Sequence, residues 1–209
     1  LVRRADTGEV VGSTRILTDE NARLAGSFYS ENEFDLTAML PLDGNAMEIG
    51  RTCIHPDYRN GATIHQLWMG VAEFMERQRI DYMFGCASIP LDDGSEAARK
   101  MLAQVQGKFS PPSKYVVNPH NPLTVSDMPG DIAGKRPRLP PLLAAYLRLG
   151  AWVVGDACLD EDFNCADVFI LLDVMNLSSR YRRHFLDGAR SRPISGEAVA
   201  MTKESASMD

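Results

Sequence analysis

The 209-residue sequence has few of the residues that build metal centres and disulfide frameworks, with four cysteines and four histidines. The histidines, at positions 55, 65, 120 and 184, give no metal-ligand spacing, and no Cys-x-x-Cys pair occurs. The cysteines, at positions 53, 86, 158 and 165, lie mostly inside apolar runs, which is typical of reduced cytosolic thiols. We therefore expect no metal, no disulfide and a cytoplasmic location.

An excess of positive charge is also lacking, because 22 Lys and Arg face 28 Asp and Glu, a formal net charge of −6. This balance does not favour nucleic acid as a partner. No apolar run reaches the roughly 20 residues that cross a bilayer, and the first ten residues have no signal-peptide core. The composition, 44% hydrophobic and 24% charged, is typical of one soluble domain. We expect this domain over residues 1–188 and a disordered tail over 189–209.

The strongest periodic pattern lies in the middle of the chain. Apolar residues recur at intervals of three and four over residues 61–80, which predicts an amphipathic helix. β-Compatible runs flank it at residues 45–54 and 81–88, so strand, helix and strand form a parallel crossover unit. Two further runs, at residues 1–4 and 9–17, surround an Asp-Thr-Gly turn and predict a hairpin.

The remaining segments are weaker. Residues 21–40 are interpreted as a short helix and a loop, and residues 110–141 as a long irregular loop of functional importance. We expect helices at 94–106, capped by Ser95, and at 142–149, followed by strands at 151–154 and 166–174. This order predicts an α/β fold with a mixed central sheet and helices on both faces.

The strand at 45–54 contains two charged residues around a glycine. Strict alternation would place Glu48 and Arg51 on opposite faces, but Gly50 is typical of a β-bulge, which would bring positions three apart to the same side. An acid that takes a proton and a guanidinium that holds an anion would then share one site. The alternative is an edge-strand ion pair with a packing glycine, which is the commoner meaning of such a pattern.

The turn after this strand, residues 57–63, is basic and polar and leads into the long helix. Free N–H groups and the helix dipole both favour an anion there. In the alternative interpretation it is a simple capping turn, in which Asn60 or Thr63 satisfies the first amides. The two interpretations are compatible.

Three other features each have two interpretations. Gly85, Cys86 and Ser88 suggest a nucleophile, but the sequence has no Gly-x-Ser-x-Gly elbow, and a packed strand of small residues is favoured. Asp167 lies inside an apolar strand and is either a secondary site residue or a structural hydrogen-bonding group. The basic cluster at 135–138 is either solvated or contacts an acidic protein or lipid headgroups.

Seven sequence blocks, in order, resemble the bacterial L-ornithine Nα-acyltransferases of ornithine-lipid synthesis, which are also described as hemolysin-like. The resemblance covers residues 1–186, and the blocks are GEVVGSTRIL, FYSENEFDL, MEIGRTCIHPDYR, TIHQLWMGV, FGCAS, LPPLLAAYLRLGAWV and DFNCADVFILLDV. The wider clan is the Gcn5-related N-acyltransferase (GNAT) fold. It includes the acyl-homoserine-lactone synthases, whose Glu-Ile-Ser-Arg block resembles residues 48–51.

This resemblance implies transfer of a 3-hydroxyacyl group from acyl carrier protein to the α-amine of ornithine, which gives lyso-ornithine lipid. It implies that the strand with Glu48 splays away from the strand with Cys86 and that the pantetheine arm lies between them. Glu48 would be the base, directly or through water, because only the free amine attacks a thioester. Arg51 would hold the acceptor's carboxylate, and amides around the bulge would receive the oxyanion.

The same resemblance implies the remaining contacts. Arg59 and the amides of Gly61, Ala62 and Thr63 would hold the phosphate of phosphopantetheine, with Cys86 and Ser88 also on the cofactor path. Glu33 and Asp35 would accept ornithine's side-chain ammonium. The clan's phosphate-loop glycines are replaced here by Ala62 and Ile64, so a carrier protein's single phosphate is favoured over coenzyme A. No cofactor is expected to be bound permanently, and the clan's first strand and two helices have no counterpart before Leu1.

Two other classes of function remain open. The first keeps the fold and changes the acceptor, as in a long-chain N-acyl amino acid synthase or an autoinducer synthase. The second is a non-catalytic module that binds a carrier protein or a membrane. The expected partners are acyl carrier protein and ornithine, without nucleic acid, and with peripheral contact to the inner membrane.

Overall fold

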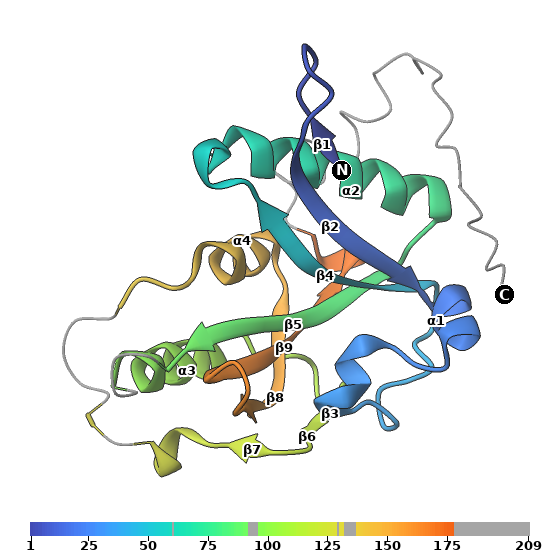
Figure 1. Ribbon diagram of the computed structural model, residues 1–209. Helices are drawn as coiled ribbons and strands as arrows, with labels where there is room; N and C mark the ends of the chain where they lie inside the picture. Colours follow the sequence, from blue (N-terminus) through green and yellow to red (C-terminus); the bar gives the residue numbers. More distant parts are fainter. Residues whose placement is uncertain (60, 92–95, 129, 132–136, 178–209) are drawn as a thin grey trace, which may run out of the picture.

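The computed structural model describes residues 1–59, 61–91, 96–128, 130–131 and 137–177. Within them, seven strands form one sheet in the order β1-β2-β4-β5-β9-β8-β7 (Figure 1). The parallel pair is β4 with β5, and the other pairings described in this sheet are antiparallel. The strands are β1 (Val2–Arg3), β2 (Val10–Thr18), β4 (Ala46–Ile54), β5 (Tyr82–Pro90), β7 (Pro122–Leu123), β8 (Trp152–Asp160) and β9 (Cys165–Asp173). A second, two-stranded sheet pairs β3 (Phe34–Asp35) with β6 (Asn118–Pro119).

The helices are α1 (Asp19–Ala25), α2 (Ala62–Gln78), α3 (Glu96–Lys108) and α4 (Pro141–Leu149). They confirm the predicted helices, and α2 joins β4 to β5 as the predicted crossover. α4 begins with a proline in its first turn and ends at Gly150, which has a φ of 105° that favours glycine. Short 3₁₀ turns lie at Tyr29–Asn32, Pro56–Tyr58, Val125–Asp127 and Val174–Asn176.

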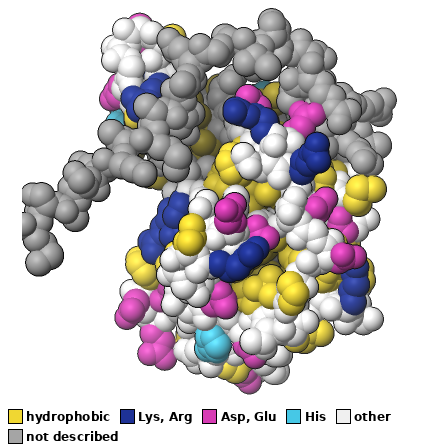
Figure 2. All heavy atoms as spheres, turned by 90° about the vertical axis from the view of Figure 1, so that its right-hand side faces the viewer, with side chains coloured by type: hydrophobic (Ala, Val, Ile, Leu, Met, Phe, Trp, Pro, Cys, Tyr) yellow, Lys and Arg dark blue, Asp and Glu magenta, His cyan; other side chains and the backbone are white. Residues whose placement is uncertain are grey.

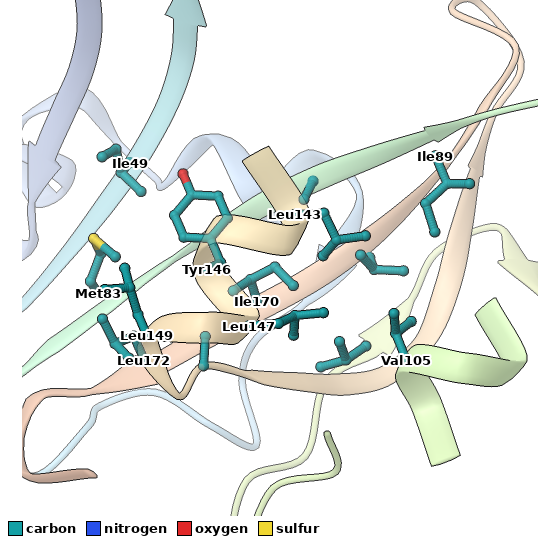
Figure 3. Close-up of a cluster of buried hydrophobic side chains, with 14 of the residues drawn as sticks. Ile49, Met83, Ile89, Val105, Leu143, Tyr146, Leu147, Leu149, Ile170 and Leu172 are labelled. Carbon is teal, nitrogen blue, oxygen red and sulfur yellow. The ribbon is translucent and has the colours of Figure 1, made fainter. Parts of the chain in front are cut away.

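One face of the sheet is covered by α2, α3 and α4. The apolar stripes of these helices bury a core with alternate residues of β4, β5, β8 and β9. Figure 3 shows α4 in this core, with Tyr146, Leu147 and Leu149 near Met83 and Ile170 of the sheet.

The other face carries a second core, to which α1, Phe28 and β3 contribute together with residues of the sheet. Aromatic rings dominate it, because Phe84 packs against both Phe28 and Phe169, with ring centroids 4.8 and 5.5 Å apart. The prediction of elements on both faces of a mixed sheet is therefore confirmed.

The predicted strand at 151–154 is too short, because β8 continues to Asp160. Gly155 and Asp156 have the sequence of a turn, but Gly155 adopts a φ of 74° and the pairing of β8 with β9 shifts between Val154 and Cys158. The strand thus passes through an irregularity instead of ending there. As a result Asp160 lies opposite Cys165, close to the site described below.

The long segment at 110–141 contains β6, β7 and a 3₁₀ turn, so it is partly ordered by strand pairing. Within the described residues no helix has the length and apolar character needed to span a membrane. The expected tail at 189–209, the proposed cap Ser95, and Lys135 and Arg136 of the basic cluster lie outside the described residues. On the face shown in Figure 2, acidic and basic side chains are interspersed and are not segregated by sign.

Candidate active site

β4 and β5 separate in the middle of the sheet. Their parallel pairing covers Ala46–Glu48 opposite Tyr82–Phe84, whereas the strands continue to Ile54 and Pro90. Figure 1 shows their arrowheads pointing apart. A Cβ atom added to Gly85 would lie 2.3 Å from the carbonyl oxygen of Ile49, so only glycine fits where the strands begin to diverge. Beyond Phe84, β5 is paired with β9 alone, which leaves its β4-facing edge open.

β4 contains the bulge that the glycine predicts. β2 pairs Ser13 with Cys53 but Arg15 with Gly50, so two residues of β4, Arg51 and Thr52, lie opposite Thr14. Arg51 takes the left-handed conformation with a φ of 52°. The Thr14 hydroxyl donates to the Gly50 carbonyl at 3.2 Å and lies 2.8 Å from the Thr52 hydroxyl. These bonds hold the bulge in place.

A cavity of about 410 Å³ lies beside the diverging strands and contains both Glu48 and Arg51. The two residues therefore share a site, as a bulge requires. The lining also comes from β2, the 3₁₀ turn Tyr29–Asn32, β5, β8 and β9, and consists of Arg15, Tyr29, Glu33, Glu48, Ile49, Gly50, Arg51, Cys86, Ser88, Pro90, Asp160, Phe163, Cys165 and Asp167.

Glu48 is 2% exposed and makes three hydrogen bonds with the turn that covers it. One carboxylate oxygen accepts from the backbone N–H and the hydroxyl of Ser30, at 2.7 and 2.5 Å. The other accepts from the backbone N–H of Tyr29 at 2.9 Å and lies 3.6 Å from the Arg15 guanidinium. The buried carboxylate is thus compensated by donors and by a cation.

The ring of Tyr29 is contacted by two arginines. The guanidinium carbons of Arg51 and Arg15 lie 4.8 and 5.1 Å from its centroid. Such cation–π contacts orient a guanidinium and leave N–H donors for an anion. Both arginines are exposed, but Arg15 is ion-paired with Glu48, whereas no ion pair of Arg51 is found among the described residues.

Three acids, Glu33, Asp160 and Asp167, line another part of the same cavity. Asp167 is 4% exposed, and its Oδ1 atom has no hydrogen-bond partner. Glu33 is half-buried, and its Oε2 atom also has none. Burial and the neighbouring charge of Asp167 raise the pKa of Glu33 to about 7, and burial raises the pKa of Asp167 as well.

The thiols beside these acids are neutral. Burial raises the pKa of Cys86 well above its usual value and that of Cys165 to about 12. The Cys86 thiol donates to the Ser30 hydroxyl at 3.4 Å, so it connects the acids to Glu48. This environment disfavours the thiolate that a nucleophile needs. Asp160, Cys165 and Asp167 each place a potential metal-ligand atom within 4.8 Å of the others, a grouping that the spacing of the histidines did not indicate.

Asp35 is not brought to this cavity. Its carboxylate accepts from the backbone N–H and hydroxyl of Thr37, at 2.9 and 2.6 Å, and these bonds lower its pKa. Asp35 was the acid expected beside Glu33, but the acid that interacts with Glu33 is Asp167. Glu33 and Asp35 are two residues apart, so an extended strand would place them on the same side. Glu33 instead ends the 3₁₀ turn in a helical conformation, with a φ of −110° and a ψ of −29°, and β3 begins after it.

A second cavity, of about 850 Å³, lies between the end of β4, the start of α2 and α4. Arg59, Arg138 and Arg148 line it together with apolar residues, among them Trp68 and Leu142. Gly61 caps α2 with a φ of 87° and lines the cavity, whereas Ala62 and Thr63 are outside its lining. The expected cap Asn60 lies outside the described residues. Cys86 and Ser88 line the first cavity, not this one.

Sequence reasoning missed several residues of the first cavity, among them Arg15, Tyr29, Asp160 and Phe163. It also missed Ser30, which binds Glu48 through its backbone and its hydroxyl. The motif FYSENEFDL was the available signal, but nothing in it specifies that the turn folds over β4. Asp160 was hidden by the early end assigned to its strand.

The fold and the comparisons with known proteins agree on the class of protein. Residues 1–69 match the model of the acetyltransferase (GNAT) domain. Among solved structures, the GNAT-like decarboxylase GphF in complex with isobutyryl-CoA is similar, with a TM-score of 0.41 and 22% identity, over 80% of this chain and 74% of that chain. With its mixed sheet and diverging parallel pair, the chain has the GNAT fold.

The similar curated proteins are more specific. The chain is 34% identical over 185 residues to the L-ornithine N(alpha)-acyltransferase of Brucella abortus, which covers 85% of this chain and 65% of the relative. It is 31% identical over 183 residues to that of Rhodobacter capsulatus, covering 86% and 70%. Against that of Rhizobium meliloti it is 33% identical over 196 residues, covering 90% and 66%. The chain belongs to the L-ornithine Nα-acyltransferase family and spans about two thirds of the length of these relatives.

Proposed function

We propose that the protein transfers a (3-hydroxy)acyl group from the thioester of acyl carrier protein to the α-amine of ornithine, which yields lyso-ornithine lipid. The observation that carries the proposal is that Glu48 and Arg51 line one cavity beside the point where β4 and β5 separate. The names of the family's curated members support ornithine as the acceptor. The donor and the product rest on the resemblance and on the geometry of the second cavity.

In this proposal Arg51 binds the carboxylate of the incoming amino acid, because a guanidinium at the mouth of the cavity offers paired N–H donors. Glu48 takes the proton from the α-ammonium. Its two oxygens already accept three hydrogen bonds, so the proton passes through a bridging water. The free amine then attacks the thioester carbonyl.

The nitrogen–carbon bond forms as the carbon–sulfur bond breaks. Backbone amides around the bulge at Arg51 stabilise the oxyanion of the tetrahedral intermediate. The nitrogen loses a second proton as the amide forms. One of the two protons goes to the thiolate and the other passes from Glu48 through the water to solvent, so the products are an amide, the free thiol of the carrier and a proton.

The donor enters between the diverging strands. The open edge of β5 beyond Phe84 offers backbone groups that can pair with a pantetheine arm. Arg59 and the amides of Gly61, Ala62 and Thr63 bind its phosphate at the N-terminal end of α2, where Arg59 and Gly61 line the second cavity. Arg138 and Arg148 add positive charge there, which suits an anionic carrier. Since the product is a lipid, we place the enzyme in the cytoplasm with peripheral contact to the inner membrane.

The test is to incubate the purified chain with acylated carrier protein, or with acyl-coenzyme A, and single amino acids. Release of free thiol and the mass of the product are followed together. The proposal predicts thiol release with ornithine and carrier protein, and an N-acylornithine product. Release with tyrosine or S-adenosylmethionine but not with ornithine would identify another acceptor and overturn the assignment.

Two variants that remove the same charge test whether Arg51 binds the carboxylate of the acceptor. Arg51→Ala should raise KM for ornithine at least tenfold, because the carboxylate loses its partner. Arg23→Ala removes the same charge from the exposed face of α1 and should leave KM unchanged. If Arg51→Ala has full activity with ornithine, the assignment of Arg51 is wrong; if only neutralising Arg138 and its basic neighbours abolishes function, the chain is a non-catalytic binding module.

A further inference from the structure

The three acids Glu33, Asp160 and Asp167, called the acid pocket below, have no obvious cationic partner among the described residues that line their cavity. Arg15 is paired with Glu48, and Arg51 lies over the ring of Tyr29. Asp167 is buried, and Glu33 and Asp160 are half-buried. Carboxylates in such surroundings cost free energy without a counter-charge, which a cationic ligand would supply. The acid pocket is therefore built for a cationic ligand.

The unsatisfied oxygen atoms point to the same conclusion independently. The Oδ1 atom of Asp167 lies in a side chain that is 4% exposed and has no hydrogen-bond partner, although it lines the cavity. The Oε2 atom of Glu33 is likewise buried and unpartnered. Asp160 already accepts from the backbone N–H of Phe163 at 3.0 Å through its Oδ1 atom. A ligand with several N–H donors on one charged centre would satisfy these atoms together.

We propose that the acid pocket binds the side-chain ammonium of the acceptor amino acid and thereby selects acceptors that carry a second amine. This inference rests on the proposed function and deepens it, because it assigns the choice of acceptor to Glu33 after the 3₁₀ turn, Asp160 of β8 and Asp167 of β9. The neutral thiols of Cys86 and Cys165 border the pocket and add no charge.

The dimensions of the site agree with this role. Glu48 is paired with Phe84 on one side of β5, and Asp167 is paired with Ser88 on the other. Their Cα atoms are thus separated by four residues along β5, roughly 13 Å, and by two strand spacings across the sheet, roughly 10 Å, or about 16 Å in all. The two nitrogens of ornithine are joined by five bonds of about 1.5 Å and lie roughly 6 Å apart when extended. Adding a contact of about 3 Å at each end spans most of that separation. One molecule can then place its α-amine toward Glu48 and its second amine in the acid pocket.

A divalent metal ion is the rival occupant, because Asp160, Cys165 and Asp167 have ligand atoms within 4.8 Å of one another. An ammonium ion is favoured because Glu33, which is not a member of that group, lines the same cavity and interacts with Asp167. The two occupants make different predictions, since the metal requires the Cys165 thiol and the ammonium does not.

The experiment compares ornithine with norvaline, which has the same chain without the second amine. The wild-type chain should prefer ornithine at least a hundredfold in kcat/KM. Asp167→Asn should reduce that preference tenfold or more, mainly by raising KM for ornithine and with little change in kcat. Asp162→Asn is the matched control, because it removes the same charge from an exposed residue outside the cavity lining and should leave the preference unchanged.

Folding does not confound the comparison, since Asp167→Asn keeps the shape of the side chain and removes a buried charge. An unchanged preference in the folded variant overturns the proposal. A bound metal overturns it as well. In that outcome the wild-type chain retains one zinc ion, Cys165→Ser loses the ion, and Asp167→Asn leaves the preference for ornithine intact.

Calorimetric titration with each amino acid, without donor, separates this inference from the proposed function. Wild-type binding of ornithine over norvaline, lost in Asp167→Asn, supports the acid pocket even if no acyl group is transferred. If ornithine and norvaline bind equally well, or neither binds, the acid pocket does not select a diamino acid.

Discussion

The carboxylate of Glu48 and Ser30 are joined by two hydrogen bonds, from the backbone N–H of Ser30 at 2.7 Å and from its hydroxyl at 2.5 Å. Because Tyr29 donates a third, one buried carboxylate ties β4 to the turn that covers it. Glu48 therefore has a structural function as well as the proposed chemical one. Experiments on this residue must separate the two.

Glu48→Ala is expected to destabilise the protein by about 2–4 kcal/mol, because it leaves three buried donors without an acceptor. Ser30→Ala removes one of these bonds and should cost about 1 kcal/mol. Urea unfolding of the three proteins provides the free energies. Equal stabilities of Glu48→Ala and Ser30→Ala would show that the turn does not depend on the carboxylate.

The raised pKa of Glu33 predicts a dependence of stability on pH. The unfolded chain releases this proton near the ordinary value of 4.5, whereas the folded chain holds it until about 7. The folded state therefore binds more protons between these values, and its free energy of unfolding falls as pH rises from about 4.5 to 7. Asp167, whose pKa is also raised, contributes in the same direction.

Glu33→Gln should make this decline shallower and should stabilise the protein at pH 7.5 relative to the wild type. The measurement is the difference in unfolding free energy between pH 4.5 and 7.5 for both proteins. Glu73→Gln, on the exposed face of α2, is the matched control and should leave the slope as it is. A Glu33→Gln slope identical to that of the wild type would refute the raised pKa.

Gly85 marks the point where β4 and β5 part, and its replacement tests that geometry. Gly85→Ala places a methyl group 2.3 Å from the Ile49 carbonyl oxygen, so the strands must move apart. We expect a loss of roughly 1–3 kcal/mol, together with lower activity. Gly70→Ala, in the exposed middle of α2 with no atom within 4 Å, should instead stabilise by about 0.5–1 kcal/mol. Similar thermal shifts for both variants would contradict this packing.

Much of the fold was predictable because it depends on local patterns. The period of the apolar residues fixed α2, and the flanking β-compatible runs then required a parallel crossover. Gly50 also indicated the bulge, although a packing glycine beside an edge-strand ion pair is the commoner meaning of such a pattern. The prediction that Glu48 and Arg51 share a site followed from that single residue, and both line the first cavity.

The remainder depends on contacts between distant segments. The acid pocket joins residues from three places in the chain. Asp167 stood out beforehand as a carboxylate in an apolar strand, and the family resemblance implied Glu33, but no local pattern brought the two together with Asp160. Asp160 was concealed because Gly155 has the sequence of a turn while the strand continues past it. The sequence also did not predict that the turn Tyr29–Asn32 lies over Glu48. The contacts are made by backbone N–H groups of Tyr29 and Ser30, which every residue except proline has.

The proposed reaction requires a base at Glu48, and the turnover of Glu48→Gln measures that requirement. The variant keeps the size of the side chain and can be checked for folding before its kcat is determined with acylated carrier protein and ornithine. We expect kcat to fall by roughly 10²–10⁴-fold, the usual contribution of a positioned acid or base. A folded Glu48→Gln protein that turns over at the wild-type rate would contradict the proposed mechanism.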